Sequence, residues 1–287
     1  MKGVGAVTSQ WRNNRCESRV RNKVAILALV LASTALAAAP AWAQPDAPPG
    51  TPPGMASRLA AERVGPLQPG LYSAGDGNFM LAPYGAGKYL LRFSDRSENF
   101  VLTMDRGSLG AKLLKYDTGT TAIRVSVWGG MTLYTSDAPQ GVPATYQGKA
   151  PAPDTLAVSA GELQTAFGDE ASHLTYVQNI AIKFSADPAV MSADAETRGR
   201  AFDALTNAAT GIERFLAANS AAHRVLAKRI TNVKVAEGGK PTITLSGQTL
   251  LVSFVPGEGH EGHASSLAIQ QELTKLLATS ARDVATK

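Results

Sequence analysis

The spacing of apolar residues changes near residue 150, and no other feature of the sequence limits the possible folds as strongly. Within residues 67–137 apolar side chains recur at every second position, for example at Tyr89, Leu91 and Phe93. A period of two is typical of half-buried β-strands. Short spacers rich in Gly, Asp, Asn and Ser separate these runs, as expected for turns. We therefore predict an antiparallel β meander or small barrel, because parallel strands would need helical crossovers and the spacers are too short for them.

A Pro- and Gly-rich interval at residues 138–158, which we predict to be a linker, precedes a region of helical spacing. Within residues 159–287 apolar residues first recur at helical intervals, as from Leu163 to Phe184. Residues 232–255 return to strand spacing and predict a β-hairpin, and a last amphipathic helix begins near Ser265. We expect an α+β protein with an N-terminal antiparallel β meander or small barrel and C-terminal helices with a β-hairpin. Whether the two parts share one core stays open.

The first 43 residues have the order of a secretory signal peptide. A basic segment is followed by the apolar run Val24–Ala38 and then by small residues at Ala41 and Ala43, so cleavage is expected before Gln44. A retained membrane anchor is the rival interpretation, but the apolar run is shorter than the ~20 residues that a spanning helix needs. We expect a periplasmic or secreted protein with no membrane anchor after cleavage.

Residues 44–66 are predicted to form a disordered spacer that ends in a short helix. Five prolines lie within residues 45–53, and large apolar side chains are missing there, so this stretch cannot build a core. The helical spacing follows over residues 55–63.

The basic charge of the whole chain belongs to its N-terminus. The formal net charge is +5, from 28 Lys and Arg against 23 Asp and Glu. Residues 1–43 hold six of the basic residues and one acid, so residues 44–287 carry 22 of each sign. Nucleic acid is therefore not expected as a partner, because it would require a field of one sign. The single cysteine, Cys16, also lies in the signal segment, so disulfides and Cys-ligated metals are not expected in the exported chain.

The densest group of metal-binding residue types lies just before the last helix. Glu258, His260, Glu261 and His263 share one loop, and imidazole with carboxylate suits a divalent transition metal such as zinc, copper or nickel. The spacing is one residue short of the helical zinc motif, and the neighbouring glycines argue against a helix. A solvated connector is the alternative. A pocket in which the histidines meet a distant Asp, Glu or His would favour an enzyme, and a loop that projects alone into solvent would favour a binding module.

Four aromatic residues in the strand region allow two interpretations. Tyr72, Tyr84, Trp128 and Tyr134 either pack in the core or across strands, or they contact carbohydrate from an exposed position. No catalytic residue is assigned, because none of the common nucleophile, phosphate-loop or dinucleotide motifs is present in the expected exported chain. No cofactor is expected apart from the possible metal.

The segment Trp128–Tyr134, with the sequence Trp-Gly-Gly-Met-Thr-Leu-Tyr, is followed by the Pro-rich segment Pro139–Ala144. A helix, a hairpin and a short Leu-rich helix follow in that order. In these features the chain resembles an uncharacterised family of secreted alphaproteobacterial proteins, a domain of unknown function, over roughly residues 67–280. The resemblance implies export and brings no catalytic or binding residue with it.

We therefore expect an exported, non-catalytic binding or interaction module whose partner is an envelope protein or a small molecule. The alternative is a periplasmic hydrolase or a metal-handling protein that uses His260 and His263. A third interpretation, a subunit of an assembly, would require an exposed apolar patch.

Overall fold

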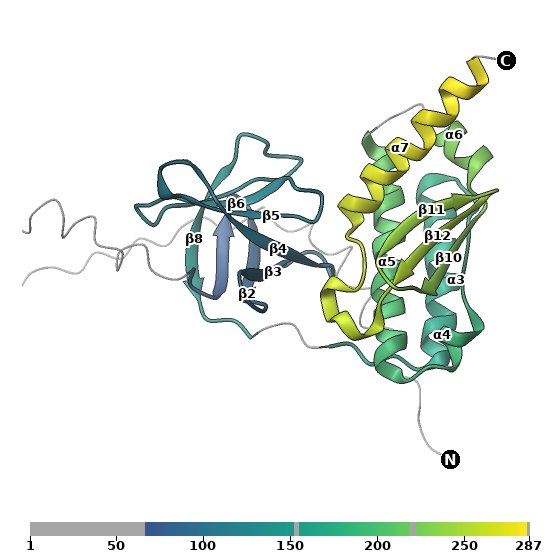
Figure 1. The fold of residues 1–287 in the computed structure, drawn as a ribbon, viewed down its shortest axis with the longest axis horizontal. Coiled ribbons are helices and arrows are strands. Elements are labelled where there is room, and N and C mark those ends of the chain that lie inside the picture. Colours follow the sequence, from purple (N-terminus) through teal and green to yellow (C-terminus); the bar gives the residue numbers. More distant parts are fainter. Residues whose placement is uncertain (1–66, 152–154, 219–221, 286–287) are drawn as a thin grey trace, which may run out of the picture. The chain divides into compact units, whose positions relative to one another are not determined.

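The computed structural model describes residues 67–151, 155–218 and 222–285, without the side chains of residues 278–285. Within these residues a closed antiparallel barrel is followed by helices and a four-stranded sheet (Figure 1). The predicted α+β class, with its barrel first and its helices second, is confirmed. The predicted signal peptide and the spacer at residues 44–66 lie outside the described residues.

The N-terminal region is a meander of eight described strands that closes into a barrel. Its strands are β1 Gly70–Ala74, β2 Gly77–Pro83, β3 Lys88–Phe93, β4 Asn99–Arg106, β5 Lys112–Lys115, β6 Thr121–Val125, β7 Met131–Leu133 and β8 Val142–Gly148, with a 3₁₀ turn η3 at Ser108–Gly110. Each strand pairs with the next, and β8 pairs with β1. The inward-facing residues of the alternating pattern form the core, and Phe79, Leu91 and Phe100 are fully buried there. Tyr72 stacks on Phe79 with ring centroids 5.3 Å apart, so this tyrosine belongs to the core.

The interval predicted as a linker, residues 138–158, instead supplies the last strand of the barrel. β8 pairs with both β7 and β1, and the linker prediction is therefore wrong for residues 142–148. The strand escapes prediction because Pro143 and the surrounding prolines and glycines are typical of a linker, although Val142, Ala144 and Tyr146 do alternate. Only Ala144 and Tyr146 of β8 pack against the barrel core.

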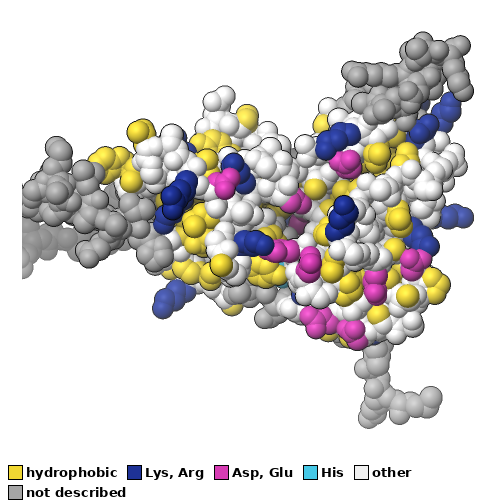
Figure 2. All heavy atoms as spheres, viewed as in Figure 1, with side chains coloured by type: hydrophobic (Ala, Val, Ile, Leu, Met, Phe, Trp, Pro, Cys, Tyr) yellow, Lys and Arg dark blue, Asp and Glu magenta, His cyan; other side chains and the backbone are white. Residues whose placement is uncertain are grey.

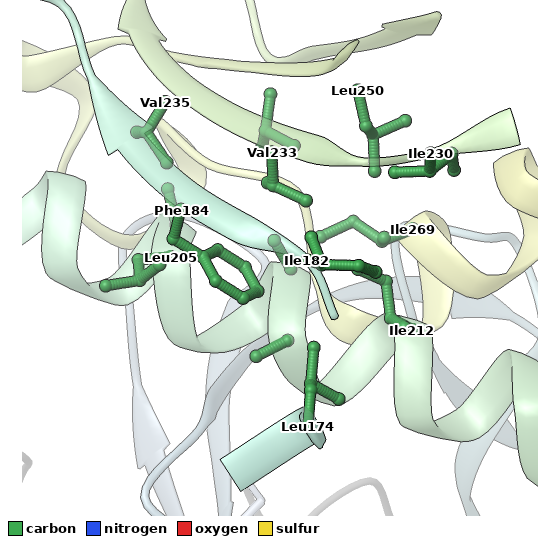
Figure 3. Packing of buried hydrophobic residues seen from close by; sticks show 14 of the residues in the cluster. Leu174, Ile182, Phe184, Leu205, Ile212, Ile230, Val233, Val235, Leu250 and Ile269 are labelled. Atoms are coloured by element: carbon green, nitrogen blue, oxygen red, sulfur yellow. The ribbon is translucent and has the colours of Figure 1, made fainter. Parts of the chain in front are cut away.

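The C-terminal region has two layers, with helices on one face of a sheet (Figure 1). Its elements are α3 Ala160–Gln178, β9 Lys183–Ala186, α4 Pro188–Ser192, α5 Ala195–Ala218, α6 Ala222–Arg229, β10 Asn232–Glu237, β11 Thr242–Ser246, β12 Thr249–Phe254, η4 Pro256–Glu261 and α7 Ser266–Ala285. α5 is central, because it contacts α3, α7, β10 and β12. Figure 3 shows Val233, Val235 and Leu250 of the sheet beside Leu205 and Ile212 of α5. Burial of such side chains, at about 1.5–3 kcal/mol each, holds the layers together.

The C-terminal sheet differs in one pairing from the hairpin predicted for residues 232–255. β11 and β12 form an antiparallel hairpin with a tight turn at Gly247, so the predicted hairpin is confirmed for these two strands. β10 lies parallel to both β12 and β9 instead of pairing with β11. The helical pattern from Leu163 to Phe184 also ends early, because Asn179 adopts the left-handed conformation (φ 52°) that terminates α3. Of the rest of that pattern, Ile180 lies between α3 and β9, and Phe184 lies on β9.

The start of α7 joins the C-terminal region to the barrel. Glu98 of the barrel accepts hydrogen bonds from the backbone N–H and the hydroxyl of Ser266 at 2.7 and 2.6 Å. Asp117 accepts hydrogen bonds from the backbone N–H and the hydroxyl of Ser265 at 3.0 and 2.7 Å. Two barrel carboxylates therefore cap the N-terminus of α7, where the helix dipole favours negative charge. Leu267 adds an apolar contact to the barrel core.

In the described parts of the chain, none of the helices has both the length and the apolar character needed to cross a bilayer.

Candidate functional site

The loop before α7 turns the two predicted histidines inward. His260, in η4, and His263 expose only 6% and 8% of their surface. Gly259 allows this turn, because its backbone (φ 58°, ψ −134°) suits glycine alone and a Cβ there would lie 2.3 Å from Oη of Tyr84. The backbone N–H of His260 donates a hydrogen bond to that hydroxyl at 3.0 Å. Gly259, one of the glycines that argue against a helix, thus permits the loop to turn the histidines inward.

α5 supplies the groups that face these histidines. Arg200, Asp203 and Asn207 are three and four residues apart, so they lie on one side of the helix. Arg200 and Asn207 are buried, and Asp203 is half-buried.

Asp203, His260 and His263 converge, and we refer to them as the Asp–His–His cluster. Each offers one ligand atom, and the three atoms lie within 4.8 Å of one another. Nε2 of His263 lies 3.7 Å from Oδ2 of Asp203. Nη1 of Arg200 lies 3.4 Å from Nδ1 of His260 and 3.7 Å from Oδ2 of Asp203. The cluster is therefore compact, with a guanidinium at its edge.

A small cleft opens beside the two histidines. Its volume is about 190 Å³. Pockets for drug-sized ligands measure ~300–1,000 Å³, so this cleft suits an ion with its waters or a small polar group. The ammonium group of Lys88 donates a hydrogen bond to Glu261 at 2.7 Å in the cleft. The lining residues are Lys88, Asn99, Val101, Thr103 and Asp117 from the barrel and His260, Glu261, His263 and Ser265 from the loop.

Burial keeps both imidazoles of the cluster neutral near pH 7. Burial, and then the charge of Arg200, lower the pKa of His260 to about 4. Burial, followed by the influence of His260 and Arg200, lowers the pKa of His263 to about 4. Burial raises the pKa of Asp203 to about 6, although Arg200 opposes this rise. At pH 7 the cluster thus holds two neutral imidazoles and an ionised carboxylate, which are the protonation states that metal ligands need.

Asn207 determines which nitrogen of His263 carries the proton. The amide nitrogen Nδ2 of Asn207 donates to the carbonyl oxygen of Ala264 at 3.0 Å, and this bond fixes the orientation of the amide. The same nitrogen lies 3.2 Å from Nδ1 of His263, which must accept, so Nε2 of that imidazole carries the proton. Nε2 of His263 and Nε of Arg200 are buried and have no hydrogen-bond partner among the described residues. Each of these two atoms therefore needs a partner from outside the described side chains, such as a water molecule or a small ligand.

The two glutamates of the predicted metal set lie apart from the cluster. Glu258 is exposed, and its carbonyl oxygen accepts a hydrogen bond from the Tyr84 hydroxyl at 3.4 Å. Glu261 forms an ion pair with Lys88. The structure thus brings together two of the four predicted residues, His260 and His263, and adds Asp203. The sequence did contain a sign of Asp203. Arg200, Asp203 and Asn207 recur at helical spacing and interrupt a side of α5 that otherwise carries mostly small and apolar residues.

Charges of both signs are spread over the face of the molecule in Figure 2. This mixture matches the balance of 22 basic and 22 acidic residues in residues 44–287.

Comparison with known proteins identifies the family and leaves the activity open. No curated protein and no solved structure gives a significant match to the chain. A family model described as a domain of unknown function matches residues 55–273, which is most of the chain. This match confirms the predicted membership in an uncharacterised family and assigns no role to the Asp–His–His cluster. The chain therefore belongs to the DUF4908 family.

Proposed function

We propose that the protein is a metal-handling binding module that holds a divalent transition metal, zinc first of all, on Asp203, His260 and His263. The observation that carries the proposal is the burial of two neutral imidazoles beside a carboxylate, with three ligand atoms within 4.8 Å. Two histidines and one carboxylate form a zinc ligand set that leaves one position open. The loop is buried against a distant acid, and this placement favours a metal site over a solvated connector. The proposal includes no reaction.

Arg200 and Asn207 make this a weak and exchangeable metal site. Metal on Nε2 of His263 moves the imidazole proton to Nδ1, so the Asn207 amide must turn and give up its hydrogen bond to Ala264. The Arg200 guanidinium also repels a cation beside it. We expect a dissociation constant on the order of 10⁻⁶–10⁻⁵ M, weaker than structural zinc sites. Such an affinity suits transfer of the metal more than permanent storage.

A second candidate ligand is a small oxyanion such as phosphate. The observation that favours it is Arg200, which is 4% exposed and whose Nε has no hydrogen-bond partner in the described residues. Guanidinium groups bind oxyanions through paired N–H donors, and the Nε2–H of His263 would add another donor. The ionised Asp203 opposes an anion, so we rank this candidate second.

Calorimetric titration with zinc and with phosphate separates the two candidates. The protein to titrate is the chain from Gln44, which contains both hydrophobic cores. For zinc, Asp203→Asn and His263→Asn should each weaken binding at least about tenfold, and His223→Asn, on α6, should leave it unchanged. Arg200→Gln should tighten zinc binding and should abolish phosphate binding. Circular dichroism confirms that each variant is folded. Zinc binding no tighter than millimolar in the wild type would contradict the proposal.

We also propose that the protein is exported to the periplasm or secreted. The support is the order of basic, apolar and small residues over residues 1–43. Cell fractionation followed by N-terminal sequencing tests this point. Export predicts Gln44 as the first residue of the periplasmic or secreted form, and a protein that retains Met1 would contradict it.

A further inference from the structure

Two neighbouring hairpins at one end of the barrel present exposed apolar side chains. The turn between β4 and β5 carries Leu109, 89% exposed, and the turn between β6 and β7 carries Trp128, 76% exposed. The two turns lie against each other, since a Cβ on Gly110 would lie 3.5 Å from Cγ1 of Val127. We refer to Leu109 and Trp128 as the apolar tips.

The backbone holds Leu109 in a conformation that does not suit leucine. Its φ of 57° and ψ of 29° are left-handed, a region that favours Gly, Asn and Asp. The side chain gains no burial in return. Backbone hydrogen bonds fix both turns, from Gly107 N–H to the Ala111 carbonyl at 2.7 Å and from Ser126 N–H to the Gly130 carbonyl at 2.8 Å. A leucine that is held in an unfavourable backbone conformation and is not buried adds no stability to the fold. Its presence therefore indicates a role in binding.

Basic side chains flank the apolar tips. Arg106 and Lys112 pair in register across the first hairpin, and Arg124 of β6 lies opposite Leu113. The acid of the first hairpin, Asp105, already pairs with Lys115 at 2.8 Å. On these strand ends the basic side chains Arg106, Lys112, Lys115 and Arg124 therefore outnumber the acid Asp105.

We propose that the apolar tips insert into the surface of a membrane that contains anionic lipids. Tryptophan favours the boundary between head groups and acyl chains, and such insertion reaches only about 5–10 Å deep. Arg106, Lys112 and Arg124 complement the negative head groups. A protein partner fits less well, because two turns fall far short of the ~800 Å² that a stable interface buries on each side. A fluid membrane, in contrast, requires no matching shape.

Tryptophan fluorescence tests the insertion directly. The chain has three tryptophans, Trp11, Trp42 and Trp128, so the chain from Gln44 retains Trp128 alone. Vesicles of phosphatidylcholine with phosphatidylglycerol should shift its emission to shorter wavelength, and vesicles of pure phosphatidylcholine should shift it far less. Added salt should reduce binding to the anionic vesicles.

Vesicle sedimentation of matched variants identifies the residues responsible. Trp128→Ala and Leu109→Asn should each lower the partition coefficient about tenfold. Leu109→Asn should do so without lowering the melting temperature, because asparagine tolerates the left-handed conformation. Tyr176→Ala, which removes a side chain of α3 that is 91% exposed, should have no effect.

Three results would overturn the proposal. The first is equal binding to anionic and neutral vesicles, or binding to neither. The second is a Trp128→Ala variant that binds like the wild type. The third is self-association in size-exclusion chromatography that Trp128→Ala abolishes, which would make the apolar tips a contact between copies of the chain.

Discussion

Gly259 is the residue on which the geometry of the histidine loop depends most. Gly259→Ala should lower the free energy of unfolding by about 2–4 kcal/mol, because it places a Cβ 2.3 Å from Oη of Tyr84 on a glycine-only backbone. Urea unfolding measures this loss. Gly257→Ala is the matched control, since a Cβ there meets no atom within 4 Å. A Gly259→Ala variant as stable as the control would contradict the described loop.

The buried imidazole of His263 makes stability depend on pH. The unfolded chain takes up this proton near pH 6.5, whereas the folded chain, with a pKa of about 4, does not, so stability falls as the pH drops from 6.5 toward 4. At pH 5 this one residue accounts for a loss of about 2 kcal/mol. Asp203 acts in the opposite sense, because its pKa is raised to about 6 and its protonated form stabilises the fold at acid pH.

His263→Asn should therefore reduce the fall in unfolding free energy between pH 7.5 and 5 by about 1–2 kcal/mol. Denaturant unfolding at the two pH values checks this, with His223→Asn as the control. If the unfolding free energy of His263→Asn falls as much between pH 7.5 and 5 as that of the wild type, this imidazole is not buried in its neutral form.

The sequence predicted half of the candidate site because half of it is local. His260 and His263 stand out, since two of the four histidines fall in one short loop. Asp203 and Arg200 do not stand out, because only the packing of α5 against that loop brings them to it. Acids and arginines at helical spacing are most often solvated, so their burial is a property of the tertiary fold.

Among the elements, α7 receives part of its N-terminal cap from the barrel, in addition to the hydrogen bond that Oγ of Ser265 accepts from the Ala268 N–H at 3.1 Å. Glu98→Ala should lower the free energy of unfolding by about 2–3 kcal/mol, because the buried N–H and hydroxyl of Ser266 would lose their partner. Glu98→Gln keeps one acceptor oxygen, so its loss of unfolding free energy should be less than half of the loss in Glu98→Ala. Thermal or urea unfolding measures both variants. Equal stability of Glu98→Ala and wild type would show that the barrel does not cap this helix.

The elements that the sequence predicted have a regular apolar period without prolines inside it. The strands up to residue 137 and the final helix follow the period closely. β8 alternates at Val142, Ala144 and Tyr146, but Pro143 and the Pro- and Gly-rich flanks conceal this pattern. β9 continues the helical spacing of α3 by coincidence, and residues 179–182, which begin with the left-handed Asn179, separate the two elements. The parallel pairing of β10 with β12 is long-range and leaves no local pattern.

At the scale of the whole molecule, the described residues have two hydrophobic cores that meet at the start of α7. The two capping carboxylates, the Lys88–Glu261 ion pair and the hydrogen bond from the His260 N–H to Tyr84 connect them, so the wild type should unfold in one calorimetric transition. The double variant Glu98→Ala with Asp117→Ala removes both capping carboxylates and should divide this transition into two. Glu272→Ala, which breaks only an exposed pair with Lys275, should keep one transition. A single transition in the double variant would show that other contacts couple the cores.

X-ray absorption at the zinc K-edge tests the central claim, that Asp203, His260 and His263 hold a metal. The zinc-loaded chain from Gln44 should show two imidazole nitrogens at about 2.0–2.1 Å and carboxylate oxygen at about 2.0–2.2 Å. His263→Asn should remove one imidazole from the spectrum, and His223→Asn should leave it unchanged. A zinc environment without imidazole, or one that His263→Asn does not alter, would contradict the account.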